Sequence, residues 1–439
     1  MSTDDAQDPA ELSPRQKALH EPNPLKRFFQ VLGPGLITGA SDDDPSGIGT
    51  YSIAGAALGF STLWLALATL PMIAAIQYSC AKIGMITGQG LAGVLRKNYP
   101  RPLLYVAVTA LFIANTLNVG ADIGAIAAAV QLLFPVPILP SIIGVSVLIL
   151  GAQILGTYSW LANVFKWLTL VLFAYIATAF FVRVDPVQVF KSTFIPTVKW
   201  TPQFISTLVA ILGTTISPYL FFWQASLQVE EDKREGKRAL WQRRGASDAE
   251  LNLAALDVNA GMIFSNLVMY FIIFTCAATL HAHGQTNIAS ATDAAKALEP
   301  LAGKFASVLL AVGLIGTGLL AIPVLTGSAA YALSEAFGWR YGLDEKAHRA
   351  KQFYGCIVIS TICGMAMNFF GLNAMQALFW SAVINGIVAP PLMVFIMLIA
   401  NDPKIMGDQT NGRLVNVFGW LATIAMGTAA VALFLTWGK

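Results

Sequence analysis

Charged residues are scarce in this chain, and their scarcity argues against a soluble protein. Only 12% of the 439 residues are Asp, Glu, Lys or Arg, whereas 56% are hydrophobic. Soluble domains carry about 25% charged residues. The 27 basic and 24 acidic side chains leave a formal net charge of +3, so no strongly basic domain indicates a nucleic-acid partner. We therefore expect a lipid bilayer around the chain and no nucleic acid.

Cysteine and histidine are also few, with four of each. Cys80, Cys276, Cys356 and Cys363 stand in hydrophobic segments without CxxC spacing, which is typical of buried apolar residues rather than of disulfides or zinc ligands. The sequence contains no HExxH or GxSxG motif. A membrane enzyme or a receptor would need a catalytic set or a sizeable soluble domain, so the sequence favours neither, and we expect no enzymatic activity.

What the chain has in abundance is long apolar segments. A membrane-spanning helix needs about 20 apolar residues in succession. By this measure the sequence predicts an all-α polytopic membrane protein with eleven transmembrane helices. Their expected ranges are Phe28–Gly59, Ser61–Ile83, Leu103–Phe134, Ile138–Leu155, Trp160–Val182, Pro202–Val229, Leu256–His281, Lys304–Leu333, Phe353–Phe370, Met375–Ala400 and Leu414–Trp437.

The most informative stretch is Gly33–Thr50, in the middle of the first segment. It contains the three consecutive carboxylates Asp42, Asp43 and Asp44, followed by Pro45-Ser46-Gly47. A charge at the hydrocarbon centre costs about 2.5–3.5 kcal/mol even on insertion scales, so such groups face a water-filled path or a cation. Proline removes a helical hydrogen bond, and freed carbonyls at membrane depth are tolerated where they line a cavity. We predict a helix broken at Asp44–Gly47 around a cation site.

Within this break the side chains are not equivalent. Asp44 directly precedes Pro45, which disfavours helical geometry at Asp44, so we rank its carboxylate as the first metal ligand. Asp43 is ranked second, and the carbonyls of Ser41 and Asp42 are further candidates. Successive residues lie about 100° apart on a helix, so the three carboxylates cannot all face one ion. The Asp42 side chain is therefore expected in a vestibule or in helix packing.

A second interruption is expected in the sixth segment, over Gly213–Pro218. Pro218 cannot donate to the carbonyl of Thr214, which leaves that oxygen for a ligand. The hydroxyls of Thr214 and Ser217 add neutral oxygens, although such hydroxyls also bond back to their own helix. Gln224, two turns farther on, either faces the same cavity or packs between helices.

The predicted ligands are all oxygens. Carboxylate, carbonyl, hydroxyl and water suit Mg²⁺, Ca²⁺ or Mn²⁺, whereas sulfur and nitrogen serve Zn²⁺ or Cu⁺ better. Small residues around the first break leave room, and Mg²⁺ gives up its water reluctantly. We therefore expect a partly hydrated Mg²⁺, Ca²⁺ or Mn²⁺ at this site and no resident cofactor.

Basic residues indicate the topology. They gather before the first predicted segment and after the second, sixth, eighth and tenth, whereas the alternate loops carry few. The positive-inside rule then places the N-terminus in the cytoplasm and Lys439 outside, in a cell (inner) membrane. Broken segments one and six open two five-helix units of opposite orientation, as in inverted-repeat transporters. The expected organisation is a disordered tail (1–27), a first repeat (28–183), a second repeat (184–400) and a final helix (401–439).

At the two breaks the sequence resembles the NRAMP family of divalent metal transporters. The resemblance rests on the Gly-Pro-Gly entry at Gly33–Gly35, on Asp44-Pro45 and on the Ile-Leu-Gly…Pro pattern ending at Pro218. It implies a LeuT-like 5+5 fold and transport of metal ions, usually with protons. The family reads Asp-Pro-Gly-Asn in its first helix and Met-Pro-His in its sixth. By the resemblance, Asp44 is the retained metal-binding aspartate.

Several positions depart from the family pattern. The Asn ligand becomes Gly47, the Met becomes Ser217 and the His becomes Tyr219. On the third helix Asp122 matches the family's Asp, whereas Ala125 replaces the Glu linked to proton movement. This pattern is similar to the NRAMP-related magnesium transporters, a branch that carries Mg²⁺ and Mn²⁺ without proton coupling. Asp122 is then either a relay for protons or ions or a helix-pairing group, and Asn385 in segment ten either completes the metal's hydration shell or packs against a helix.

These observations predict a transporter that imports Mg²⁺, and Mn²⁺ as well, by alternating access and without protons. Segments one and six would rock against the other helices, with Asp122, Tyr219 and Asn385 as coupling or gating groups. The alternatives are a proton-coupled Mn²⁺/Fe²⁺ transporter and a sodium-coupled amino-acid carrier. The carrier is disfavoured because three adjacent aspartates would repel a substrate carboxylate. Divalent ions and lipid are the expected partners, with no obligatory protein partner.

Overall fold

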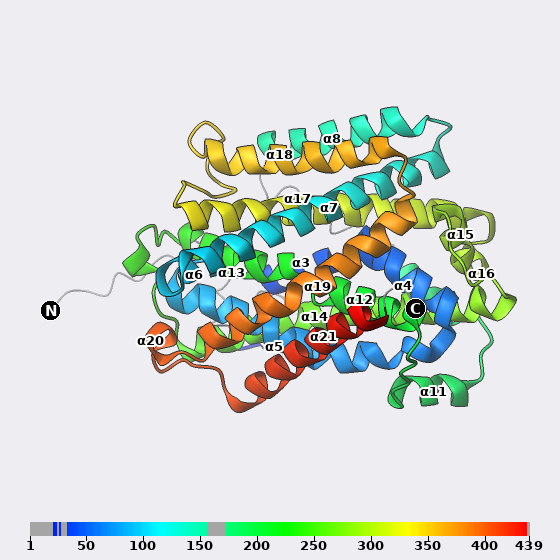
Figure 1. Cartoon of the computed structure of the whole chain (residues 1–439), viewed down its shortest axis with the longest axis horizontal. Helices are drawn as coiled ribbons and strands as arrows, with labels where there is room; N and C mark the ends of the chain where they lie inside the picture. Colours follow the sequence, from blue (N-terminus) through cyan, green and yellow to red (C-terminus); the bar gives the residue numbers. More distant parts are fainter. Residues whose placement is uncertain (1–20, 24–25, 28–32, 157–171, 437–439) are drawn as a thin grey trace.

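The computed structural model describes residues 21–23, 26–27, 33–156 and 172–436, and in these ranges every regular element is a helix. The helices form one elongated bundle, with most axes along its length (Figure 1). Most of the predicted tail lies outside these ranges. So does much of the predicted fifth span, of which α10 (Phe173–Ala179) is described.

Nine helices in the described ranges are long and apolar enough to cross a membrane, judged by length and composition. They coincide with predicted segments two to four and six to eleven. In chain order they include α5 (Trp64–Thr87), α7 (Arg101–Leu133), α8 (Ile138–Leu155), α12 (Pro202–Thr215) continued by α13 (Pro218–Arg234), α14 (Asp248–Thr279), α17 (Ala306–Phe337), α18 (Lys351–Met367), α19 (Ala374–Ala400) and α21 (Arg413–Thr436).

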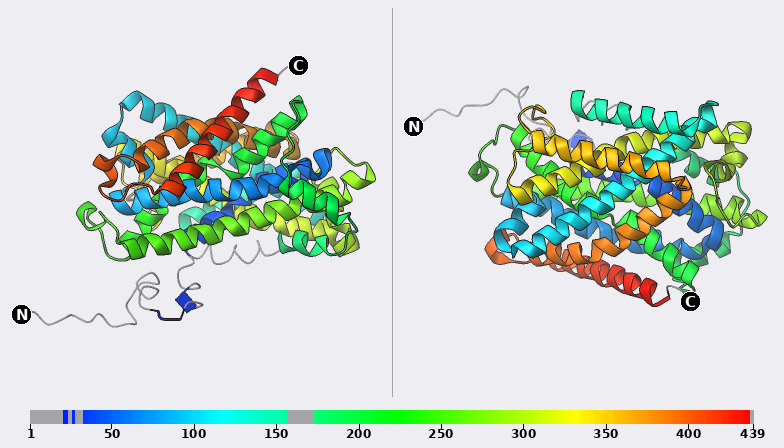
Figure 2. Two further views of the ribbon diagram at one scale, coloured as in Figure 1. Left: turned by 90° about the horizontal axis from the view of Figure 1, so that it is seen from below. Right: turned by 45° about the horizontal axis from the view of Figure 1, so that its top comes forward.

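Short helices mark the two ends of the bundle. One end carries α6 (Leu91–Asn98) and α20 (Pro403–Met406), and we call it the α6 end. The other carries α11 (Pro186–Phe194), α15 (Ala291–Ala295) and α16 (Glu299–Ala302), and we call it the α11 end (Figure 1). Figure 2 shows α8 and α21 on opposite outer faces of the bundle, so the broken helices lie between these faces.

The first predicted segment is two helices, α3 (Pro34–Asp42) and α4 (Pro45–Leu58). Pro45 is the first residue of α4, a position whose N–H has no partner within the helix, so its absence breaks no hydrogen bond. The Asp44 carboxylate caps that helix. The interruption is therefore at Asp43–Asp44, whereas the sequence predicted Asp44–Gly47. That prediction was wrong at its far end because Ser46 and Gly47, taken as helix breakers, form the first turn of α4.

The sixth predicted segment is interrupted in the same way. Ile216 and Ser217 separate α12 from α13, and Pro218 is the first residue of α13. The break lies within the predicted Gly213–Pro218 range but is shorter, because α12 stays helical through Thr215.

A close backbone contact sets α3 against α14. A Cβ atom on Gly39 would lie 2.3 Å from the carbonyl oxygen of Gly261 in α14. No side chain fits in that space, so two glycines allow the helices to touch. This contact holds the end of α3 and its acidic residues deep in the bundle.

Candidate functional site

Asp44 is the centre of the candidate site. Its side chain is buried, and its Oδ1 accepts hydrogen bonds from the Gly47 N–H at 2.7 Å and from the Ser46 hydroxyl at 2.8 Å. Its Oδ2 accepts from Nδ2 of Asn118 in α7 at 2.8 Å. The carboxylate is thus oriented from both sides by donors. Two hydrogen bonds use both lone pairs of Oδ1, so the lone pair that remains for a cation is on Oδ2.

A line of polar side chains extends from Asp44 along α7 and α19. Nδ2 of Asn118 is also 3.4 Å from Oδ2 of Asp122, one turn farther along α7. Nδ2 of Asn385 in α19 is 3.5 Å from Oδ1 of Asn118. Oδ1 of Asp122 and Oδ1 of Asn385 are buried and accept no hydrogen bond within the described ranges. Asp122 and Asn385 therefore reach the site through Asn118.

The break of the second helix contributes hydroxyl groups. The Thr214 hydroxyl is 3.3 Å from that of Ser46. The Ser217 hydroxyl donates to the carbonyls of Gly213 at 2.9 Å and Thr214 at 2.6 Å. The Thr214 carbonyl, which the sequence predicted to be free, is therefore occupied, because the serine hydroxyl replaces the N–H that Pro218 lacks.

Gly47 faces a small space between the two breaks. A Cβ atom at this position would lie 3.4 Å from the Asp42 carbonyl oxygen and 3.4 Å from the Thr214 hydroxyl oxygen. Two neutral oxygens therefore border the volume that a larger side chain would occupy. The Tyr51 ring carbon Cε2 lies at the same 3.4 Å distance, so a methyl group at this position would be in contact on three sides.

Tyr219 connects the two broken helices directly. Its hydroxyl donates to the Ser41 carbonyl at the end of α3, at 2.8 Å, and its side chain is fully buried. The Ser41 carbonyl, predicted as a metal ligand, thus already accepts one hydrogen bond. A second lone pair remains on that oxygen.

Asp42 faces a different helix from Asp44. Its Oδ2 accepts a hydrogen bond from the Ser265 hydroxyl of α14, which agrees with a packing role. Both oxygens of Asp43 are buried and have no hydrogen-bond partner in the part of the chain described. Asp43 is thus the carboxylate here that lacks protein donors, whereas Asp44 is joined to Thr214, at the end of α12, through the Ser46 hydroxyl.

Gln224 lies away from this centre. Its Oε1 accepts from the Thr38 hydroxyl at 2.5 Å, which joins α13 to α3. This is a contact between packed helices, and the buried Nε2 of Gln224 has no hydrogen-bond partner among the described residues. It does not contact Asp44.

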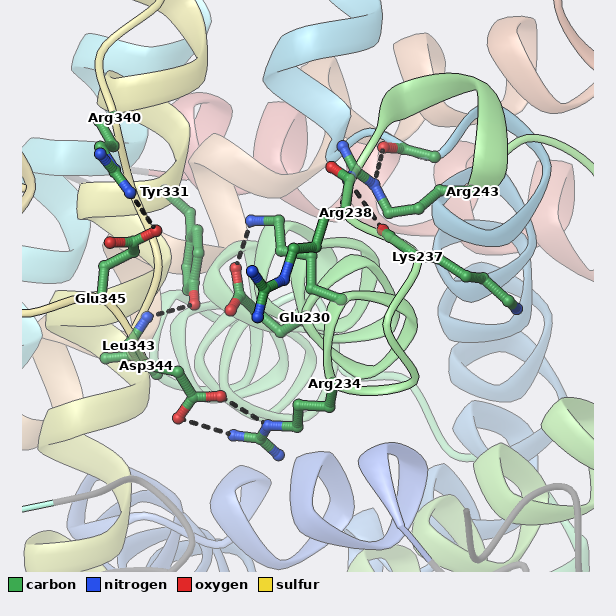
Figure 3. Close-up of polar contacts among 12 residues, drawn as sticks. Glu230, Arg234, Lys237, Arg238, Arg243, Tyr331, Arg340, Leu343, Asp344 and Glu345 are labelled. Atoms are coloured by element: carbon green, nitrogen blue, oxygen red, sulfur yellow. Dashed lines mark hydrogen bonds and ion pairs between the residues drawn. The ribbon is translucent and has the colours of Figure 1, made fainter. Parts of the chain in front are cut away.

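Two further groups hold the α6 end of these helices. Asp257 of α14 accepts hydrogen bonds from the N–H groups of Gly33, Gly35 and Leu36, at 2.9, 2.6 and 3.1 Å, and so caps α3. At the end of α13, Nε of Arg234 is 2.7 Å from Oδ2 of Asp344 in the loop after α17 (Figure 3). Both contacts join a broken helix to its neighbours.

Sequence reasoning missed Asn118 and Asp257. Asn118 precedes Asp122 by four residues, and residues at that spacing share a helix face, so the pattern was available. Asp257 had no such signal, because its partners are more than 200 positions away along the chain. Among the described residues, no three His, Cys, Asp or Glu side chains converge on one point. A cation here would depend on Asp44 together with neutral oxygens.

Comparison with known sequences gives a consistent result. A family model described as "Natural resistance-associated macrophage protein-like" (Nramp) matches residues 35–436. A "Divalent metal cation transporter MntH" from Deinococcus radiodurans is 27% identical over 423 residues, covering 95% of this chain and 91% of that protein. A protein of the same name from Erwinia tasmaniensis is 26% identical over 402 residues, covering 91% of this chain and 92% of that protein.

Solved structures share the fold. A manganese transporter from Eremococcus coleocola superposes with a TM-score of 0.73 at 19% identity, covering 95% of this chain and 88% of that one. Mhp1, a nucleobase-cation-symport-1 family transporter, superposes with a TM-score of 0.56 at 13% identity, covering 92% of each chain. The prediction of an all-α, LeuT-like architecture is confirmed.

Proposed function

This chain belongs to the Nramp family, and on that premise we propose that it is a divalent metal cation transporter that moves Mg²⁺, and Mn²⁺ as well, by alternating access. It is a transporter and not an enzyme. The metal is its cargo, and the chain needs no resident cofactor for this activity.

The observation that carries the proposal is the environment of Asp44. The groups that contact its carboxylate are the amide of Gly47, the Ser46 hydroxyl and the Asn118 amide, with the Thr214 hydroxyl next to Ser46. The Gly47 and Asn118 N–H groups orient the carboxylate, and the Ser46 and Thr214 hydroxyls are the neutral oxygens beside it. One carboxylate with few neutral oxygens suits a hard cation that keeps part of its water.

Ser217 supports the preference for Mg²⁺. It stands where the family has a thioether, and its hydroxyl is bonded to its own backbone. A soft ligand would favour transition metals over the more abundant Mg²⁺. Its replacement by a hydroxyl removes that advantage.

On this proposal, the membrane potential drives import, and no second ion has to be transported with the metal. A membrane potential contributes about 2.3 kcal/mol per charge per 100 mV, so a divalent cation accumulates in a negative interior on its own. The orientation proposed from the basic loops, with the N-terminus in the cytoplasm of a cell membrane, gives inward transport. The two broken helices would rock against α7 and α19 while Asp44 keeps hold of the ion.

A proton-coupled mechanism is the second candidate, and one observation favours it. Asp122 is buried, has one oxygen without a partner and is joined to Asp44 through Asn118. A second buried carboxylate this close to Asp44 can itself take up a proton when the metal leaves. Against it stands Ala125, which occupies the position of the family's second acidic residue.

The test is flux into proteoliposomes that contain a Mg²⁺ dye and a pH dye. We expect Mg²⁺ and Mn²⁺ to enter without acidification, and Asp44→Ala to abolish entry. Asp408→Ala, a change at an exposed aspartate, is the matched control and should retain full flux. Acidification that Asp122→Asn removes would establish the proton-coupled alternative. No entry of either metal through folded protein would overturn the assignment and return attention to an organic substrate.

A further inference from the structure

An apolar groove opens on the side of the bundle between α5, α12 and α21. Its volume is about 330 Å³. The hydroxyl of Thr69, one of its few polar groups, already donates to the Leu65 carbonyl at 2.7 Å and to Oδ1 of Asn266 at 2.8 Å. The groove lies between membrane-spanning helices, so its natural surroundings are hydrocarbon chains. Its walls include Met72, Leu208, Leu212, Ala429 and Ala432.

The rim of this groove has the features of a membrane surface. Nε1 of Trp64 donates to the Thr197 carbonyl at 3.3 Å, which fixes the segment that leads into α12. Val198 and Trp200 from this segment line the groove, and Trp200 is 73% exposed. Lys199, between them in the sequence, is also exposed. Tryptophan is enriched where a bilayer meets water, and a lysine beside it can pair with the phosphate of a lipid headgroup.

Helix α11 provides an independent indication of the same surface. Val187, Phe190 and Phe194 recur at the i, i+3, i+7 spacing of one helix face, and they are 59%, 65% and 60% exposed. This helix packs on α5, which forms one wall of the groove. A short helix with an exposed apolar face at the end of a membrane bundle lies on the bilayer interface.

We propose that this groove is a binding site for one anionic phospholipid. An acyl chain lies between α5, α12 and α21, and Lys199 pairs with the phosphate at the rim. The apolar groove matches the acyl chain, and the positive charge of Lys199 matches the negative charge of the phosphate. Leu212, part of the groove wall, lies two residues before Thr214. A bound chain would therefore support α12 next to its break.

Native mass spectrometry of the full chain tests the proposal, with an equimolar mixture of phosphatidylglycerol and phosphatidylcholine as the probe. We expect one retained lipid with a preference for phosphatidylglycerol. Thr428→Trp fills the groove from α21, where Thr428 is exposed, and should remove that lipid. Ile424→Trp is the matched control on the same helix, because Ile424 is 63% exposed and does not line the groove.

Two further variants show whether a loss of lipid reflects misfolding, and they distinguish binding of the acyl chain from binding of the lipid headgroup. Ala68→Phe fills the groove from α5 and should give the same loss as Thr428→Trp. Lys199→Gln should keep one lipid but lower the preference for phosphatidylglycerol about fivefold, the contribution of one lysine near an anionic surface. Unchanged lipid retention in both filled variants would overturn the proposal. So would a dimeric mass that Thr428→Trp converts to a monomer, since the groove would then be covered by a second copy.

Discussion

Nδ2 of Asn118 donates to Oδ2 of Asp44 at 2.8 Å, and this bond joins an unbroken helix, α7, to the break between α3 and α4. The same nitrogen lies 3.4 Å from Oδ2 of Asp122. One amide thus contacts two of the buried carboxylates of this region, Asp44 and Asp122. If α3 and α4 move during transport, this is a bond that must lengthen or move with them.

Replacing Asn118 tests its role in orienting Asp44. Asn118→Ala should raise the half-saturating Mg²⁺ concentration about tenfold, because a hydrogen bond to a charged group contributes about 1.5 kcal/mol or more. Dye-monitored flux at varied Mg²⁺ measures it. Asn115→Ala is the control, since Asn115 lies on the same helix and its amide donates to the Leu325 carbonyl at 2.9 Å instead. Equal effects of the two changes would show that Asn118 acts through general stability.

The identity of residue 217 should decide the preference between hard and soft ions. Ser217→Met introduces a thioether at the second break, so entry of the soft ion Cd²⁺ should rise relative to Mg²⁺ entry. The ratio of fluxes measured on one preparation reports this directly. Ser226→Met adds the same side chain at another buried position of α13 and should leave the ratio unchanged. A constant ratio in Ser217→Met would contradict a contact between this residue and the ion.

The glycine contact between α3 and α14 should be sensitive to a single methyl group. Gly39→Ala would place Cβ 2.3 Å from the Gly261 carbonyl oxygen, and overpacking of this kind costs about 1–3 kcal/mol. Thermal unfolding in detergent should show a lower midpoint. Gly144→Ala in α8 is the control, because its Cβ would meet nothing within 4 Å and alanine favours a helix. A midpoint that falls equally in both variants would rule out the contact as the cause.

The ion pair in Figure 3 should contribute little to stability. Arg234 and Asp344 have 33% and 42% exposed side chains, and exposed pairs contribute about 0.2–1 kcal/mol. A double-mutant cycle of Arg234→Ala and Asp344→Ala, followed by thermal unfolding, measures the coupling. The neighbouring Arg340–Glu345 pair, 56% and 33% exposed, is a reference of the same kind. Coupling of about 3 kcal/mol or more would mean that the pair is desolvated in the working protein.

The sequence by itself determined the features that arise locally. Apolar length alone located the nine spans that the structure describes, and Pro45 and Pro218 located the breaks, because proline cannot continue a helix from within. The similar placement of these breaks predicted two five-helix repeats, and the resemblance to the NRAMP family implied the LeuT-like architecture, which is confirmed. The metal-binding role of Asp44 and the choice of Mg²⁺ remain predictions.

Only the tertiary structure decided which side chains meet. Asp42 turns toward Ser265 and Asp44 toward Asn118, a division that the run of three aspartates does not contain. The Tyr219 hydroxyl reaches Ser41 across 178 positions of chain. Helical periodicity reports which face of a helix a residue occupies, but not which helix lies opposite. That pairing depends on how the whole bundle packs, with its buried polar groups matched across helices far apart in the sequence.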